Sequence, residues 1–289
     1  MSIIDLEFKK LCKTILTYGV EYENKRRGVK RLQIPSYTFR HEFKDGFPAL
    51  SLKHLPFKSV VGELLWFLRG DNDIKYLNDN GIKIWNDDAY NWHVKNGGDL
   101  TKEEFNERGT GSVGRNYSMQ WTDFNNEVDQ IASLMIDMDK DIMGSRLIVS
   151  AWNPSELDQT ALPPCHTFFQ IIGVPLENDQ FGFELHWHQR SVDAFLGLPF
   201  NIGSYATMSK DLEDKTGYKA IAIQGDLKAV HFYENQYEAV KEMLLNNTNK
   251  HGNCELEISN GGKEIEDFKL IGYTSEKAIK VKMLAPLKI

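Results

Sequence analysis

The chain has 289 residues, of which 41% are hydrophobic and 26% are charged, and its formal net charge is −7 at pH 7. This is the composition of a globular protein, and its acidic balance argues against a general nucleic-acid-binding surface, so an anionic ligand must be met by locally placed arginines. Three widely spaced cysteines, no apolar leader and no apolar run of the ~20 residues that cross a bilayer predict free thiols in a reducing cytoplasm, away from membranes.

Helices are expected where apolar residues recur every three or four positions. The first such pattern covers 5–20. A stronger one lies within 59–77, and we expect its helix to end at Gly70. The span from about Asp88 to Glu107 is polar and contains glycine, and we expect a loop insertion there.

The second half of the chain is rich in short β-branched and aromatic runs, which predict strands. These runs cover 146–153, 167–174, 182–193, 220–224, 254–259 and 267–274, and helical patterns cover 201–216 and 237–247. The turn-like segment 175–180 joins two of the strands. Because no internal repeat, linker or regular strand–helix alternation is present, we expect an α+β fold: a single domain over residues 1–289, with a large mixed or antiparallel twisted sheet covered by helices.

The stretch "ALPPCHTFFQ" (161–170) places Cys165 after two prolines. Pro163 and Pro164 fix φ and remove two backbone donors, so the chain is stiff where the thiol emerges, as a positioned nucleophile requires. A thiolate also needs a cation to lower the thiol pKa from about 8.5, and Arg190 in "HQRSVD" is the candidate. The alternative is that Cys165 is a small buried hydrophobe at the start of a strand.

A metal site is a further alternative, with Cys165, His166, His186 and His188 as ligands, because His186 and His188 share one face of a strand. However, an adjacent Cys-His pair is not a standard ligand spacing and no second cysteine pair exists. The sequence therefore predicts no metal.

Several motifs taken together resemble the thymidylate synthases, and the resemblance runs from about Phe8 to Ile289. They are "DGFP", "GELLWFLRGD", "VSAWNPSEL", "PPCH", "HQRSVDAFLGLPFNIGSYA" and "HFY". The resemblance implies a homodimer with its large sheet at the dimer interface. It also implies an activity, the methylation of deoxyuridylate (dUMP) with 5,10-methylenetetrahydrofolate as carbon donor and reductant.

The catalytic residues that this resemblance implies are Glu63, Tyr117, Cys165, Arg190, Asp193 and Asn201. Cys165 is expected to add as thiolate to C6 of the uracil ring, which makes C5 nucleophilic. Asn201 is expected to read N3 and O4 with its amide, where cytidylate-modifying relatives carry aspartate. Glu63 is expected to organise waters for proton transfer, and Tyr117, in the altered motif "GRNYSMQW", to help remove the C5 proton.

The resemblance also implies two sets of binding residues. Those for the nucleotide are Arg26, Arg146, His166, Gln189, Arg190, Ser191, Asn201, His231 and Tyr233. Those for the folate are Ile84, Trp85, Asp193, Leu196, Gly197, Phe200 and Ile289. His231 and Tyr233 are expected at the ribose 3'-hydroxyl, and the arginines at the phosphate, whose oxygens they bind bidentately. Arg146 is expected to be donated to the partner's site.

The sequence also departs from the family pattern. Ser145-Arg146 replaces a tandem arginine, so one guanidinium is missing, and the loop "RRGVKR" offers Arg27, Lys30 or Arg31 in its place. The approach to His231, "QGDLKAVHFY", is altered as well. Three alternatives therefore stay open: a hydroxymethyltransferase of the same family, a ribonucleotide or other pyrimidine nucleotide as substrate, and a silent nucleotide-binding homologue. Trp85 and the C-terminal "APLKI" favour methylation, because the family's C-terminus closes over the folate and excludes water.

Overall fold

A seven-stranded sheet crosses the molecule in the order β1-β2-β7-β5-β4-β3, with β6 paired to β7 beside this path. The computed structural model describes residues 2–24 and 28–281, so Arg26, Arg27 and Ile289 lie outside the described residues. The sheet strands are β1 (Val20–Asn24), β2 (Val29–Glu42), β3 (Ile148–Ser150), β4 (His166–Pro175), β5 (Phe181–Gln189), β6 (Val192–Asp193) and β7 (Lys219–Tyr233). A separate hairpin pairs β8 (Glu255–Ile258) with β9 (Phe268–Ile271).

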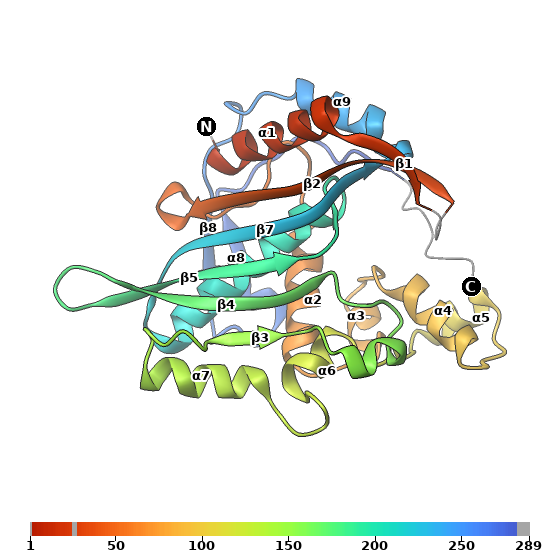
Figure 1. Ribbon diagram of the computed structural model, residues 1–289, viewed down its shortest axis with the longest axis horizontal. Coiled ribbons are helices and arrows are strands. Elements are labelled where there is room, and N and C mark those ends of the chain that lie inside the picture. The colour runs from red at the N-terminus through yellow and green to blue at the C-terminus, as the bar shows by residue number, and fades with distance from the viewer. Residues whose placement is uncertain (1, 25–27, 282–289) are drawn as a thin grey trace.

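Helices flank this sheet (Figure 1). The α-helices are α1 (Ile3–Tyr18), α2 (Phe57–Leu68), α3 (Lys75–Asp79), α4 (Asn86–Lys95), α5 (Lys102–Arg108), α6 (Tyr117–Thr122), α7 (Gln130–Lys140), α8 (Gly197–Thr216) and α9 (Tyr237–Leu245). Short 3-10 helices are η1 (Phe43–Asp45), η2 (Pro154–Gln159), η3 (Glu234–Gln236) and η4 (Ile265–Asp267). Among the described residues, no helix combines the length and the apolar character that crossing a membrane requires.

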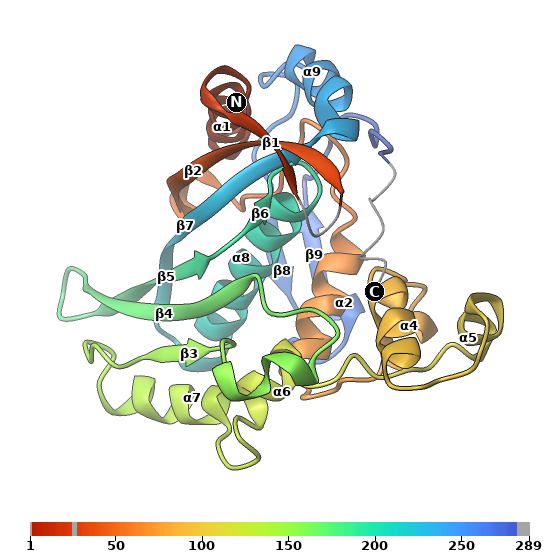
Figure 2. The same cartoon turned by 45° about the vertical axis from the view of Figure 1, so that its right-hand side comes forward.

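The sheet is mixed, because β5 and β6 run parallel to β7 while the other pairs are antiparallel. Figure 2 shows α8 and α2 together on one side of it. Facing them, β4 and β5 bury Phe169 and Trp187 on the inner face and turn Phe168 and His188 to the outer face. The Trp187 ring stacks on Tyr205 of α8 at 4.8 Å. The α+β single-domain prediction with a mixed sheet is confirmed.

Helix α8 lies at the centre of the core, and residues 201–209 are all buried. A glycine allows α2 to approach it closely: a Cβ on Gly203 would stand 3.2 Å from Cγ1 of Val60. Because α8 begins at Gly197, directly after β6, its first two turns lie beside the ends of β5 and β6, which is where the predicted site residues are found.

The predicted loop at about 88–107 is wrong, since this segment contains most of α4 and nearly all of α5. Thr101 and Glu104 form a capping box at the start of α5, and Gly109 ends the helix with a φ of 68°. Phe105 is 1% exposed and packs against Tyr90 of α4. A few aromatic contacts thus bury these two short helices, although their other faces are polar.

Candidate active site

Cys165 stands directly before β4, and the arginine at the end of β5 braces the segment that leads to it. Arg190 donates from Nε to the carbonyl oxygen of Pro164 (2.7 Å) and from Nη2 to that of Pro163 (2.8 Å). Its backbone N–H donates to the carbonyl of Cys165 (2.9 Å). The half-buried thiol is in no disulfide. The structure therefore places a guanidinium on the two residues that precede the thiol.

Tyr117, the first residue of α6, touches the Cys165 backbone. Its hydroxyl oxygen accepts from the backbone N–H of Cys165 (2.6 Å) and, at 3.4 Å, from that of His166. The ring is enclosed by Phe67 and His166, with centroid distances of 4.9 and 4.7 Å. Burial raises the pKa of Tyr117 well above its ordinary value, so the hydroxyl stays protonated and keeps an O–H to donate.

A chain of buried polar side chains runs from β4 through α8 to β5. His166 bonds Tyr205 through Nδ1 (3.1 Å), and its Nε2 accepts from Nδ2 of Asn201 (3.0 Å). The Asn201 Oδ1 accepts from Nε2 of Gln189 (3.0 Å), which also donates to the carbonyl of Ser191 (3.3 Å). Burial lowers the pKa of His166 to about 3, so the ring is neutral and carries its proton on Nδ1. This chain fixes the orientation of the Asn201 amide.

Glu63 lies on α2 and meets a tryptophan of the α3–α4 connection. The indole Nε1 of Trp85 donates to Oε1 of Glu63 (2.7 Å). Burial raises the pKa of Glu63 to about 7, although the hydrogen bond from Trp85 acts in the opposite direction. Near neutral pH both protonation states of this carboxyl are populated, which suits a group that passes protons on. Ile84, half-buried, precedes Trp85.

Asp193 of β6 is held by the start of α8. Its Oδ1 accepts from the backbone N–H groups of Phe195 (3.0 Å) and Leu196 (2.9 Å), and its Oδ2 accepts from Nε2 of Gln236 (2.9 Å). A Cβ on Gly197 would stand 3.7 Å from Cβ of Asp193 and 3.9 Å from Oδ1 of Asn201. The predicted residues Leu196, Gly197 and Phe200 therefore gather at one end of α8, and Gly197 lies between Asp193 and Asn201.

His231 of β7 pairs with Asp193 in the sheet register, and its ring lies 4.8 Å from that of Tyr233. Its Nδ1 donates to the carbonyl of Ala229 (2.7 Å), so the ring carries a proton on Nδ1. Ala229 has a φ of 44°, in the left-handed region, in the middle of β7. Pro35 stands opposite it, between the pairs Ile34↔Val230 and Ser36↔Lys228, and has no N–H to offer.

The predicted phosphate arginines are only partly accounted for. Ser145 and Arg146 are exposed, just before β3, and the carbonyl of Ser145 accepts from Nε2 of Gln170 (3.0 Å). Arg31 pairs with Tyr233 across β2 and β7 and hydrogen-bonds its side chain. By contrast, Lys30 forms an ion pair with Glu21 (3.3 Å). Lys30 and Arg31 are the two candidates for replacing the missing guanidinium that lie within the described residues. Of these two, only Arg31 contacts a predicted site residue, Tyr233.

Comparison with known proteins shows the family of this chain. A family model described as Thymidylate synthase matches residues 6–285. The chain belongs to the thymidylate synthase family. The thymidylate synthase of Malacoplasma penetrans (strain HF-2) is 35% identical over 292 residues, which cover 96% of this chain and 99% of that protein. The sequence-based assignment to the thymidylate synthases and the prediction of an enzyme are thus confirmed. Enzymes of this family bind dUMP and use methylenetetrahydrofolate as cosubstrate.

Sequence reasoning missed several residues that contact the candidate site. Lys53 is 9% exposed, with Nζ 4.8 Å from the Phe195 ring centroid, and burial lowers its pKa to about 8 against the opposing charge of Asp193. Gln236 and Tyr205 were missed as partners of Asp193 and His166. Only Tyr205 had a usable signal in the sequence: it lies four residues after Asn201 in a predicted helix, so both side chains fall on the same helix face.

The alternative metal ligands are used otherwise in this fold. His186 bonds Glu184 (2.9 Å), and His188 bonds Oγ1 of Thr167 (2.7 Å) and stacks on Phe168. Within residues 2–24 and 28–281, no group of three or more His, Cys, Asp or Glu side chains is arranged to hold a metal ion.

Proposed function

We propose that this chain methylates dUMP at C5 with 5,10-methylenetetrahydrofolate as carbon donor and reductant, through a covalent adduct between Sγ of Cys165 and C6. The observation that carries the proposal is the oriented amide of Asn201, which bonds His166, the residue that follows Cys165 and contacts Tyr117. The hydrogen bonds from His166 and Gln189 hold that amide in one orientation. The family assignment supports the same reaction.

Ring recognition follows from counting the hydrogen bonds of Asn201. An amide has two N–H donors and two acceptor lone pairs on oxygen. His166 takes one donor and Gln189 takes one lone pair, so one donor and one acceptor remain. These complement O4 and N3–H of uracil. Cytosine has the reverse polarity at both positions and would need a flipped amide, which His166 and Gln189 oppose.

The covalent step needs a thiolate. Cys165 gives its proton to solvent, and Arg190, bound to the carbonyls of Pro163 and Pro164, stabilises the negative sulfur. The thiolate forms the bond to C6, and the electron pair of the C5–C6 double bond moves toward O4. Glu63 and Tyr117 then take part in proton transfer at O4 and C5. Glu63 suits this role because its pKa is near neutral, and Tyr117 because its hydroxyl stays protonated and can donate.

The remaining predicted residues have binding roles in this proposal. His231 and Tyr233 bind the ribose 3'-hydroxyl, and the hydrogen bond from Nδ1 to the carbonyl of Ala229 fixes the orientation of the His231 ring. Arg190, Ser191 and Arg26 take the phosphate. Ile84, Trp85, Asp193, Leu196, Gly197, Phe200 and the terminal Ile289 hold the folate.

A second copy of the chain completes the site in this proposal. The outer face of β3 and β4 carries the exposed apolar side chains Ile148 and Phe168. Such a face fits an interface with a second copy, to whose phosphate site the exposed Arg146 would be donated. Size-exclusion chromatography with light scattering tests the dimer, and loss of nucleotide affinity in Arg146→Ala tests the donated arginine.

The reaction itself is tested by incubating the protein with dUMP and methylenetetrahydrofolate and identifying both products by mass. Thymidylate with dihydrofolate is the expected result. Hydroxymethyldeoxyuridylate with tetrahydrofolate would show instead that water captures the intermediate. No product, with nucleotide binding retained, would show a silent homologue. Cys165→Ser serves as the matched control, because it keeps the shape of the site and removes the ionisable thiol.

A further inference from the structure

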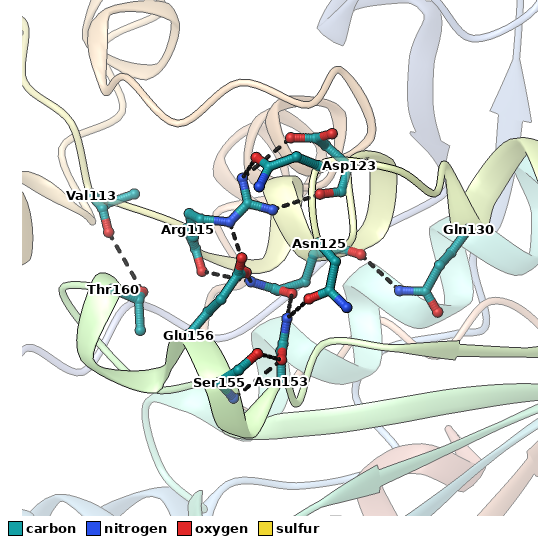
Figure 3. A network of polar contacts seen from close by, with 11 residues as sticks. Val113, Arg115, Asp123, Asn125, Gln130, Asn153, Ser155, Glu156 and Thr160 are labelled. Carbon is teal, nitrogen blue, oxygen red and sulfur yellow. Dashed lines mark hydrogen bonds and ion pairs between the residues drawn. The ribbon is translucent and has the colours of Figure 1, made fainter.

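Arg115, two residues before Tyr117, is at the centre of a network of ion pairs and hydrogen bonds that no proposed step uses (Figure 3). Its Nε donates to Oε2 of Glu156 in η2 (2.7 Å). Its Nη1 meets Oδ2 of Asp123 (3.2 Å) and Oδ1 of Asn126 (3.0 Å), and its Nη2 donates to the carbonyl of Asp123 (2.6 Å). One guanidinium thus joins η2 to the turn that follows α6.

The backbone joins the same two segments. Arg115 N–H donates to the carbonyl of Gln159 (2.8 Å), and Ala161 N–H donates to that of Val113 (2.9 Å). Gly114 between them has a φ of 73°, and a Cβ there would stand 2.2 Å from the Gln159 carbonyl oxygen. Only glycine permits this approach. The segments 113–116 and 156–161 therefore run side by side in a fixed register.

Both segments lead directly into the reaction centre. Tyr117 follows the first by one residue, and Cys165 follows the second by four. The two meet again where the Tyr117 hydroxyl accepts from the Cys165 N–H (2.6 Å). The result is a closed loop of contacts with the Arg115–Glu156 ion pair at one end and the Tyr117–Cys165 hydrogen bond at the other. Glu156 is 7% exposed, so the ion pair is largely shielded from solvent.

We infer that Arg115 is a positioning residue for the covalent step: by holding η2 against the start of α6 it sets, through Tyr117, where the Cys165 sulfur stands. This rests on the proposed function in that Cys165 is the nucleophile. Gln120 of α6 also donates to Glu156 (2.7 Å), but it carries no charge, so this hydrogen bond is weaker than the one from Arg115 and holds η2 less firmly.

The test is a double-mutant cycle of Arg115→Gln with Tyr117→Phe, read by the rate of Cys165 alkylation with iodoacetamide in the absence of substrates. Cys12 and Cys254 are buried, so the reagent reports on Cys165. In the wild-type background, Arg115→Gln should lower the alkylation rate and kcat by about tenfold to a hundredfold, with KM for dUMP changed by less than about threefold. In the Tyr117→Phe background the same substitution should have an effect of less than about threefold.

Two further variants keep the inference falsifiable. Asp123→Asn removes only the exposed arm of the network and should leave the alkylation rate within about twofold of the wild type. Arg115→Lys keeps the charge, and should fold and give an intermediate rate even where Arg115→Gln unfolds. Equal losses in both backgrounds, or wild-type alkylation in a folded Arg115→Gln or Arg115→Lys protein, would overturn the inference. If the two substitutions are coupled in the alkylation rate but the wild-type protein makes no thymidylate, the proposed function is refuted and the positioning role of Arg115 is not.

Discussion

Replacing Glu63 by glutamine should stabilise the protein in a pH-dependent way. Glutamine keeps an oxygen to accept from Trp85 Nε1 but has no charge to desolvate. Burial raises the pKa of Glu63 from 4.5 to about 7. Each pKa unit of that difference corresponds to about 1.36 kcal/mol. Ionising the Glu63 carboxyl in the folded protein therefore lowers the free energy of unfolding by at most about 3 kcal/mol.

The direction follows from the two protonation equilibria. Below pH 4.5 the carboxyl is protonated in both the folded and the unfolded chain, and Glu63 has no pH-dependent effect on stability. Between pH 4.5 and about 7 the folded chain holds a proton that the unfolded chain has released, so stability falls as pH rises. Above about pH 7 the loss is complete. The advantage of Glu63→Gln should therefore be absent at low pH and grow to at most about 3 kcal/mol above neutrality.

Urea unfolding of both proteins at one protein concentration, in steps between pH 4 and 8, measures this difference. Glu156→Gln is the matched control with the opposite sign. Burial acts to raise the pKa of Glu156, but hydrogen bonds from Arg115 and Gln120 outweigh it and lower the pKa. Its removal should therefore destabilise fully above pH 4.5, and this effect should fade as pH falls from 4.5 through the lower pKa of the folded protein. A constant gap between Glu63→Gln and the wild type at every pH would show that the Glu63 charge is not the cause.

Four further outcomes are expected. Cys165→Ser should abolish product formation while circular dichroism and the melting temperature stay near those of the wild type, and turnover in that variant would end the covalent mechanism. Glu63→Gln should lose most of its turnover although it gains stability, as rate assays above pH 7 would show. Asn201→Asp should shift the ratio of kcat/KM values from uracil toward cytosine nucleotides, because a carboxylate cannot donate to O4; an unchanged ratio would contradict the reading of the ring. Ser145→Arg should tighten nucleotide binding about tenfold in calorimetric titration, by adding a charge-assisted donor of roughly 1.5 to 3 kcal/mol, unless Arg31 already fills that place.

The elements predicted from the sequence were those with a strong local pattern. The apolar stripe of α2 and the β-branched and aromatic runs of β4 and β5 led to correct types and approximate bounds. Strand β2 was missed because its residues are mostly half-exposed or exposed and include Pro35, so it lacks the usual signs of a central strand. It forms because β1 and β7 pair with both of its edges. Such long-range pairing leaves no local pattern.

Within the site, the family motifs supplied residue types but not their partners. That Arg190 binds the carbonyls of Pro163 and Pro164 explains the stiff approach to Cys165, yet nothing in the sequence pairs those positions. The neutral state of His166 depends on its burial in the fold and has no sequence signal. Arg115 fell inside a quoted motif and was passed over, because its role comes from Glu156, which lies 41 residues away.

The left-handed backbone of Ala229 has a consequence for which substitutions β7 tolerates. An L-residue at a φ of 44° is strained by roughly 1 to 2 kcal/mol, and a β-branched side chain by more. Position 229 should therefore behave in a saturation mutagenesis screen as a glycine site occupied by alanine: glycine and asparagine enriched, valine, isoleucine and threonine depleted. That profile is the inverse of what a strand interior normally selects, and it would mark the bend that turns the residue 229 carbonyl toward His231.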